Sequence, residues 1–140
     1  MGLYGVNVGV LFICTITSMI LGSLWYGPFF GKQWIKMMGW SKKDIQKGMA
    51  NKTAMYRSYA LGFVTSFVGA LVVGILVKAT TLYGWLGGAG LGALLWLGLV
   101  ATTSLSSVIW EGKNFRLWTL NNSYSLLNLM IVGAIMGTWG

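Results

Sequence analysis

Few side chains in this 140-residue sequence could carry acid–base or metal chemistry, and they lie far apart. The chain has two acidic residues, one cysteine and no histidine. Glu111 is the sharpest candidate, because a carboxylate at the edge of a membrane span can bind a cation or carry a proton. A pairing with a neighbouring basic side chain would explain Glu111 as a structural residue instead. Both interpretations stay open at this stage.

A second candidate is a polar set near the C-terminus. Asn121, Ser125 and Asn128 are spaced i, i+4 and i+7, so they share one face of a helix. The rest of the set is Asn122 and, in the preceding segment, Thr102 and Ser106. Asn–Ser/Thr bonds between two helices would satisfy these groups in lipid, and we favour that interpretation. The alternative is a polar cavity, open to the cytoplasm, that binds a small solute.

Other chemistry is excluded by residue type. Without histidine there is no Ser-His-Asp or Cys-His arrangement, and haem lacks its usual ligand. Two acids and one cysteine, far apart in sequence, predict no zinc or calcium site. No GxxxxGK[ST] phosphate-binding loop is present. We therefore predict a protein that is not an enzyme and has no metal and no cofactor.

Composition predicts the elements that must position these residues. Hydrophobic residues make up 56% of the chain and charged residues 9%, against about 25% charged in a typical soluble domain. The apolar runs are continuous, which favours helices over the alternating strands of a barrel. We predict one all-α domain, a polytopic membrane protein with four transmembrane helices. Their expected spans are about residues 5–28, 57–78, 84–110 and 115–138.

The distribution of charge predicts the orientation. Seven of the ten basic residues lie between Lys32 and Arg57, Lys113 and Arg116 lie between the third and fourth spans, and Lys78 stands alone. Basic loops stay cytoplasmic. This predicts a multi-pass protein of the bacterial inner membrane with both termini outside. The flanking stretches are too apolar for a domain that binds nucleic acid, so no nucleic-acid partner is expected.

The basic loop, residues 31–57, is expected to have structure of its own. Ser41 and Asp44 fit a capping box, which predicts a short amphipathic cytoplasmic helix between spans one and two. Its basic side chains could meet anionic lipid, and a solvated connector is the alternative. The candidate lipid contacts are Lys32, Lys36, Lys42, Lys43 and Arg57.

Aromatic residues cluster where the first span ends. Trp25, Tyr26, Trp34 and Trp40 are predicted to anchor the chain at headgroup depth, where amphipathic rings concentrate. Gly27 and Pro28 are expected to end or kink the helix, because proline has no N–H to donate.

Small residues recur at four-residue spacing and predict close helix packing. Such lines let helix backbones approach in lipid, within one chain or between chains, and we expect a homo-oligomer. The lines are Gly62, Ser66, Ala70 and Gly74; Gly84, Gly88 and Gly92; Gly90, Gly98, Thr102 and Ser106; and Gly133 and Gly137.

Three segments carry a family resemblance. They are "LGSLWYGPFFGKQWIKMMG" (residues 21–39), "WEGKNFRLW" (110–118) and "LNNSYSLLNLMIVGAIMG" (120–137). In this order they resemble the bacterial four-helix membrane family catalogued as domain of unknown function 1761. The resemblance implies a polytopic inner-membrane protein and implies no reaction.

The sequence is compatible with three functions. The first is a structural or partner-binding membrane subunit. The second is a small oligomeric transporter or channel that uses Glu111 and the face formed by Asn121 and Asn128. The third is a membrane protein that binds anionic lipids through its basic loop. The expected partners are membrane lipids, a second copy of the chain or another membrane protein.

Overall fold

The computed structural model describes residues 2–140, and for Leu3 it describes the backbone alone. The fold is all-α, apart from a two-residue antiparallel ladder near the N-terminus. In chain order the elements are β1 (Gly2–Leu3), β2 (Val6–Asn7), α1 (Val8–Leu24), η1 (Trp25–Phe29), α2 (Gly31–Met38), α3 (Lys42–Ala50), α4 (Lys52–Thr80), α5 (Gly84–Leu95), η2 (Trp96–Ala101), α6 (Thr102–Ile109) and α7 (Phe115–Trp139). Elements η1 and η2 are single π-helical turns that continue α1 and α5.

Three helical segments are long and apolar enough to cross a membrane. They are Val8–Phe29, Lys52–Thr80 and Gly84–Ile109. Together they indicate a multi-pass membrane protein. The fourth long helix, α7, has 25 residues and carries the asparagines of the polar set.

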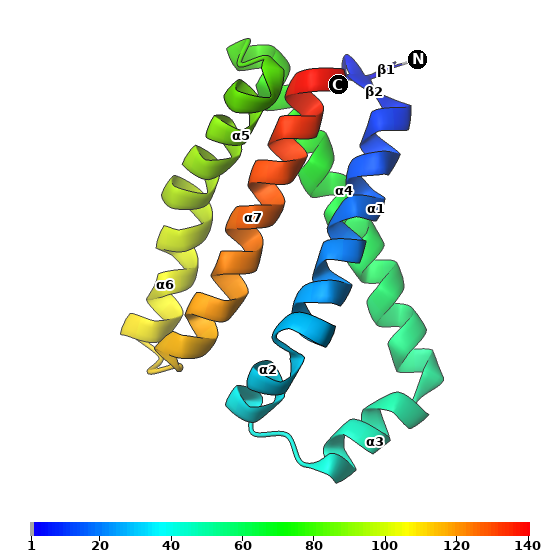
Figure 1. Cartoon of the computed structure of the whole chain (residues 1–140), viewed down its shortest axis with the longest axis vertical. Coiled ribbons are helices and arrows are strands. Elements are labelled where there is room, and N and C mark those ends of the chain that lie inside the picture. Colours follow the sequence, from blue (N-terminus) through cyan, green and yellow to red (C-terminus); the bar gives the residue numbers. More distant parts are fainter. Residues whose placement is uncertain (1) are drawn as a thin grey trace.

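The long helices form two pairs (Figure 1). One pair is α7 with the continuous rod of α5, η2 and α6, which lie side by side along their length. The other pair is α1 and α4, which cross near the end that holds both termini and then diverge toward α2 and α3. Helix α7 also packs on α1 and α4, so it joins the two pairs.

The core lies where α1, α4 and α7 meet, near the end of the bundle that holds both termini. Leu11 and Cys14 of α1 are fully buried there, together with Val77 of α4 and Met136 of α7. The small residues Ala70 and Gly74 let α4 approach, and a Cβ on Gly74 would meet Met136 and Val6. The half of the small-residue line in α4 that contains Ala70 and Gly74 therefore packs against other helices of the same chain.

Glycines bring α5 and α7 into backbone contact. A Cβ on Gly88 would overlap the carbonyl group of Gly133, and a Cβ on Gly133 would overlap the carbonyl group of Gly88. Gly92 and Gly137 are equally close to the backbone of the facing helix. In contrast, a Cβ on Gly90 or Gly98 would meet nothing within 4 Å. Of the two small-residue lines predicted here, one packs inside the chain and the other faces outward.

The connector between α1 and α4 contains two short helices. The capping box is confirmed: the Ser41 hydroxyl accepts from Asp44 N at 3.2 Å, and Asp44 Oδ2 accepts from Ser41 N at 2.9 Å. Helix α3 ends before Asn51, whose side chain caps α4 by accepting from Ala54 N. Helix α2 was not expected as a separate element. It begins after Phe30, where the π-helical turn that contains Pro28 ends.

Candidate functional site

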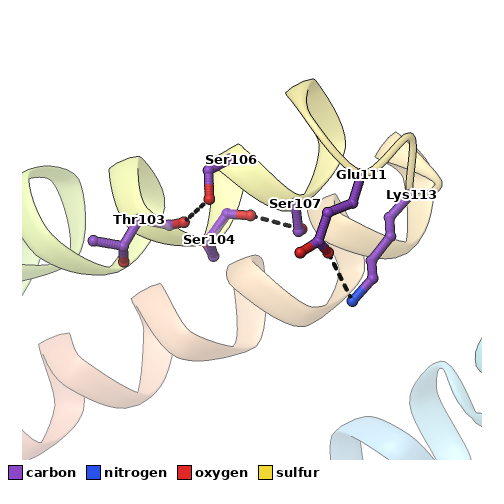
Figure 2. Close-up of polar contacts among 6 residues, drawn as sticks. All are labelled: Thr103, Ser104, Ser106, Ser107, Glu111 and Lys113. Carbon is purple, nitrogen blue, oxygen red and sulfur yellow. Dashed lines mark hydrogen bonds and ion pairs between the residues drawn. The ribbon is translucent and has the colours of Figure 1, made fainter.

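Glu111 lies in the turn after α6, outside the helices (Figure 2). Its side chain is 60% exposed and pairs with Lys113 at 3.3 Å. The pair is solvent-facing, so its net contribution to stability is small. The geometry matches the structural interpretation of Glu111. Among residues 2–140, no three His, Cys, Asp or Glu side chains gather where they could hold a metal ion.

The hydroxyls of α6 are mostly bonded to their own helix. Thr102 donates to the Gly98 carbonyl at 2.7 Å, and Ser106 donates to the Thr103 carbonyl at 2.7 Å. Figure 2 shows the second of these bonds and the similar one from Ser107 to Ser104. Both Thr102 and Ser106 are exposed. These two candidates thus lie on the outer face of α6, away from α7, and their donors are already satisfied.

Ser104 of α6 and Asn122 of α7 form a side-chain hydrogen bond between these two helices. Asn122 is 6% exposed; its Oδ1 accepts from the Ser104 hydroxyl at 2.9 Å, and its Nδ2 donates to the Trp118 carbonyl at 2.9 Å. The Trp118 indole N–H donates to the Ser104 hydroxyl at 3.0 Å. Every polar atom of the Asn122 side chain therefore has a partner inside the bundle, as a polar group in lipid requires.

Two tryptophans hold the same stretch of α7 from opposite sides. The Trp25 indole donates to the Leu120 carbonyl at 3.0 Å, and the Trp96 indole donates to the Asn122 carbonyl at 2.8 Å. Each tryptophan is the first residue of a π-helical turn, η1 or η2. The two π-helical turns thus place one indole each from α1 and α5 against α7.

The remaining bonds join α7 to α1. The Tyr26 hydroxyl donates to Asn121 Oδ1 at 2.6 Å, and the Tyr124 hydroxyl donates to the Ser18 carbonyl at 3.0 Å. We refer to this whole network as the polar belt. Its members are Ser18, Trp25, Tyr26, Trp96, Ser104, Trp118, Leu120, Asn121, Asn122 and Tyr124.

The other two members of the predicted polar face are placed differently. Ser125 donates to the Asn121 carbonyl at 3.3 Å, within its own helix. Asn128 Oδ1 is the one buried side-chain oxygen or nitrogen without a partner in the part of the chain that the structure describes. The three residues predicted to share one face are therefore bonded differently: Asn121 bonds to Tyr26 of η1, Ser125 bonds within α7, and Asn128 Oδ1 has no partner.

Three of the four predicted aromatic anchors, Tyr26, Trp34 and Trp40, contact one another in a row, and the fourth, Trp25, contacts Phe30 and Tyr124. Ring centroids lie 5.7 Å apart for Tyr26 and Tyr124, 4.9 Å for Tyr26 and Trp34, and 4.9 Å for Trp34 and Trp40. This aromatic row runs from α7 through η1 to α2 and the start of α3. It fixes the path of the chain where the first long helix ends, in addition to any contact with headgroups.

An open groove of about 600 Å³ lies where α1 and α4 diverge. We refer to it as the α1–α4 groove. Hydroxyl and aromatic side chains dominate its lining, and Glu111 is not among the residues that line it. They are Ser18, Met19, Gly22, Ser23, Tyr26, Trp34, Tyr59, Gly62, Thr65, Ser66 and Tyr124. The groove is thus built against one side of the polar belt, through Ser18, Tyr26 and Tyr124.

A family model described as a protein of unknown function, DUF1761, matches residues 10–137. The chain belongs to this family. The match runs from the third residue of α1 almost to the end of α7, so it includes the whole polar belt and the α1–α4 groove. No curated protein and no solved structure matches the chain. DUF1761 carries no assigned activity.

The predicted lipid contacts of this DUF1761 protein are distributed over three helices. Lys32 and Lys36 lie on α2, Lys42 and Lys43 on α3, and Arg57 near the start of α4. All five are exposed. They share one end of the bundle, whereas Lys78 lies near the opposite end of α4.

Sequence reasoning missed six residues of the polar belt. Four contribute side chains, Trp96, Ser104, Trp118 and Tyr124, and two, Ser18 and Leu120, contribute backbone carbonyls. One signal for Trp96 was present, because an indole N–H in a long apolar run must find an acceptor. The sequence offered no such signal for Ser104, since four hydroxyl residues stand within five positions there.

Proposed function

We propose that this DUF1761 protein crosses the bacterial inner membrane four times, with both termini outside, and acts as a structural subunit that binds a second copy of itself. The α1–α4 groove is the observation that carries the proposal. Its occupant would be a transmembrane helix of the second copy.

The fourth crossing is α7. Its 25 residues reach about 37 Å at 1.5 Å per residue, enough for a hydrocarbon core of about 30 Å. Its asparagines lower its hydropathy, but Asn121 and Asn122 have partners on η1 and α6, which leaves Asn128 Oδ1 as the one buried asparagine oxygen of α7 without a partner. A helix whose polar side chains are satisfied by its neighbours can lie in lipid.

Orientation follows from nine basic residues at one end of the bundle and Lys78 at the other. The test uses a Cys14→Ala background with Met49→Cys or Tyr83→Cys. Both positions are exposed, and they flank the two ends of α4: Met49 lies on α3 and Tyr83 immediately before α5. A membrane-impermeant maleimide added to intact cells should label Tyr83→Cys and spare Met49→Cys. The reverse pattern would overturn the orientation.

A helix is the expected occupant of the groove because of the small-residue line in α4. One part of this line packs against the core of the chain, and the other part faces the groove. Ala70 and Gly74 are packed against the core, whereas Gly62 and Ser66, further along the same line, face the groove. A Cβ on Gly62 would meet nothing within 4 Å. Small residues at an unfilled helix face are the surface on which transmembrane helices associate.

The test of association is cross-linking at Ser66, in the same Cys14→Ala background. Ser66→Cys is close in size to the native residue and lies in the groove. The matched control is Val64→Cys, which is 55% exposed and lies on the opposite face of α4 at similar depth. A short bis-maleimide added to membranes should give a covalent dimer with Ser66→Cys and little with Val64→Cys. Equal dimer from both, or none from either, would overturn the proposal.

A small solute is the second candidate occupant. The volume of about 600 Å³ and the hydroxyl lining are typical of small-molecule sites. This candidate predicts that Ser66→Cys forms no dimer and that a water-soluble maleimide labels it from the cytoplasmic side in inverted vesicles.

A further inference from the structure

Two adjoining pockets lie between α2 and the first turns of α7, at the basic end of the bundle. Their volumes are about 320 and 350 Å³, and Gln33, Met37 and Arg116 line both. We refer to them together as the α2–α7 cleft. One pocket adds the apolar residues Trp25, Phe30 and Leu120, with Thr119 and Ser123; the other adds Lys36 and Asn114. The cleft is therefore amphipathic, with a cationic half and an aromatic half.

The cationic half has no acidic counter-charge. Lys36 and Arg116 are both exposed and come from different helices. The two acids of the chain are engaged elsewhere, since Glu111 pairs with Lys113 and Asp44 caps α3. Arg116 lies in the first turn of α7, where the helix dipole is also positive. The site therefore favours an anion that both residues can contact.

The aromatic half selects among anions. The Trp25 indole N–H is already bonded to the Leu120 carbonyl, and Phe30 lies 4.5 Å from Trp25 by ring centroids. This half thus offers ring faces and few free donors, which suit an acyl chain rather than more phosphate. A free phosphate would use Lys36 and Arg116 and gain nothing from Phe30.

We propose that the α2–α7 cleft binds one anionic phospholipid. Arg116 and Lys36 hold the phosphate, with the planar guanidinium forming paired N–H···O bonds. Gln33 and Asn114 line the same pocket and can bond the polar part of the headgroup. Phe30, Met37 and the face of Trp25 contact the first carbons of an acyl chain. This site is independent of the α1–α4 groove and does not require a second copy.

The test compares two double variants with the same change in charge. K36Q/R116Q removes both cations of the cleft, and K47Q/K52Q removes two exposed cations outside it, one on α3 and one at the start of α4. The purified full-length chain in neutral detergent is titrated with phosphatidylglycerol or phosphatidylcholine, and bound lipid is counted by native mass spectrometry. Loss of two surface cations is expected to weaken phosphatidylglycerol binding by roughly 10- to 30-fold in the cleft variant. The control variant K47Q/K52Q should stay within about 3-fold of the wild type.

Two further measurements separate a lipid site from a site for a free anion. Phe30→Ala should weaken phosphatidylglycerol binding while leaving both cations in place. Millimolar glycerol 3-phosphate should not displace the lipid. Unchanged melting temperatures must accompany these results, so that loss of binding is not loss of folding.

The proposal fails under any of three outcomes. The two double variants could lose phosphatidylglycerol equally, which would indicate general attraction to a basic surface. Phosphatidylcholine could bind as tightly as phosphatidylglycerol. Glycerol 3-phosphate could displace the lipid completely, which would indicate a site for a soluble anion.

Discussion

The pairs α5–α7 and α1–α4 both carry lines of small residues, yet only the first is closed along its length. In the α5–α7 pair, Gly88 meets Gly133 and Gly92 meets the backbone at Leu129, so two backbones touch. In the α1–α4 pair, a Cβ added to Gly22 of α1 would contact the Tyr124 side chain of α7, and a Cβ added to Gly62 of α4 would have no atom within 4 Å. Close approach therefore requires small residues at facing positions of both helices.

The connections reinforce the difference. The rod that ends with α6 joins α7 through residues 110–114, which keeps the two helices side by side. Helices α1 and α4 are separated by residues 25–51, with η1, α2 and α3 between them. The longer connector lets its two helix ends lie apart (Figure 1). The lining of the groove includes Tyr26 and Trp34 of this connector and Tyr59 near the start of α4.

The largest effect is expected from adding one methyl group to the closed pair. Gly88→Ala would place a Cβ against the Gly133 carbonyl, where backbone lies on both sides and no side chain can move away. We expect a loss of about 3 kcal/mol in unfolding free energy, the upper part of the usual range for overpacking. The measurement is reversible unfolding in detergent micelles, followed by circular dichroism.

The same substitution should be harmless at open positions. Gly90→Ala lies two residues away on the same helix, and Gly62→Ala lies in the α1–α4 groove; neither new Cβ would meet an atom within 4 Å. Replacing glycine with alanine in a helix gains up to about 1 kcal/mol. If Gly62→Ala destabilised the monomer as much as Gly88→Ala, the distinction between the closed and open pairs would be wrong.

The next largest effect concerns the two sides of α7. Asn122→Leu would remove the bond to Ser104 and the bond to the Trp118 carbonyl, at a cost of about 1–2 kcal/mol. Asn121→Leu would remove one bond, from Tyr26, at a less buried site, and should cost less. Thermal unfolding of both variants under identical conditions would show this order, and the opposite order would contradict it.

Local signals in the sequence predicted local structure well. The Ser41–Asp44 capping box needs only four residues, and it formed. The run that contains Pro28 did end the first long helix, in a π-helical turn. The three apolar segments that could span a membrane overlap the first three expected spans. These features depend on residues near one another in the chain, so one sequence is enough to find them.

The partners within the polar belt could not be predicted for a geometric reason. Spacing rules assume 3.6 residues per turn, but η2 inserts a wider turn before Thr102 and rotates the residues that follow. Thr102 and Ser106 are exposed, on the same outward line as Gly90 and Gly98, whereas Ser104 faces α7. The adjacent residues Asn121 and Asn122 are about 100° apart on their helix, so they meet different neighbours. The partners of Ser104, Asn121 and Asn122 therefore depend on how each helix is rotated about its own axis in the bundle.

A smaller effect is expected in the connector of the open pair. The pKa of Asp44 is held below its ordinary value by hydrogen bonds from the Ser41 backbone and hydroxyl. A lowered folded-state pKa stabilises α3 at pH values above the unfolded pKa of about 4, and the effect is lost as pH falls through the folded value. Amide hydrogen exchange should therefore show faster opening of the first turn of α3 below about pH 4. Asp44→Asn keeps an acceptor without the charge, and its exchange should show no such acid-dependent opening in this region.

The smallest effect is expected at Glu111, in the short connection of the closed pair. Glu111→Gln removes an ion pair whose two side chains are 60% and 66% exposed, so solvent already screens most of the attraction. The expected change in unfolding free energy is below about 1 kcal/mol, and added salt should reduce it further. Lys113→Gln removes the other partner and is the matched control. If Glu111→Gln changed stability by several kcal/mol and Lys113→Gln did not, Glu111 would have a partner other than Lys113, and the loop of the closed pair would need a role beyond joining α6 to α7.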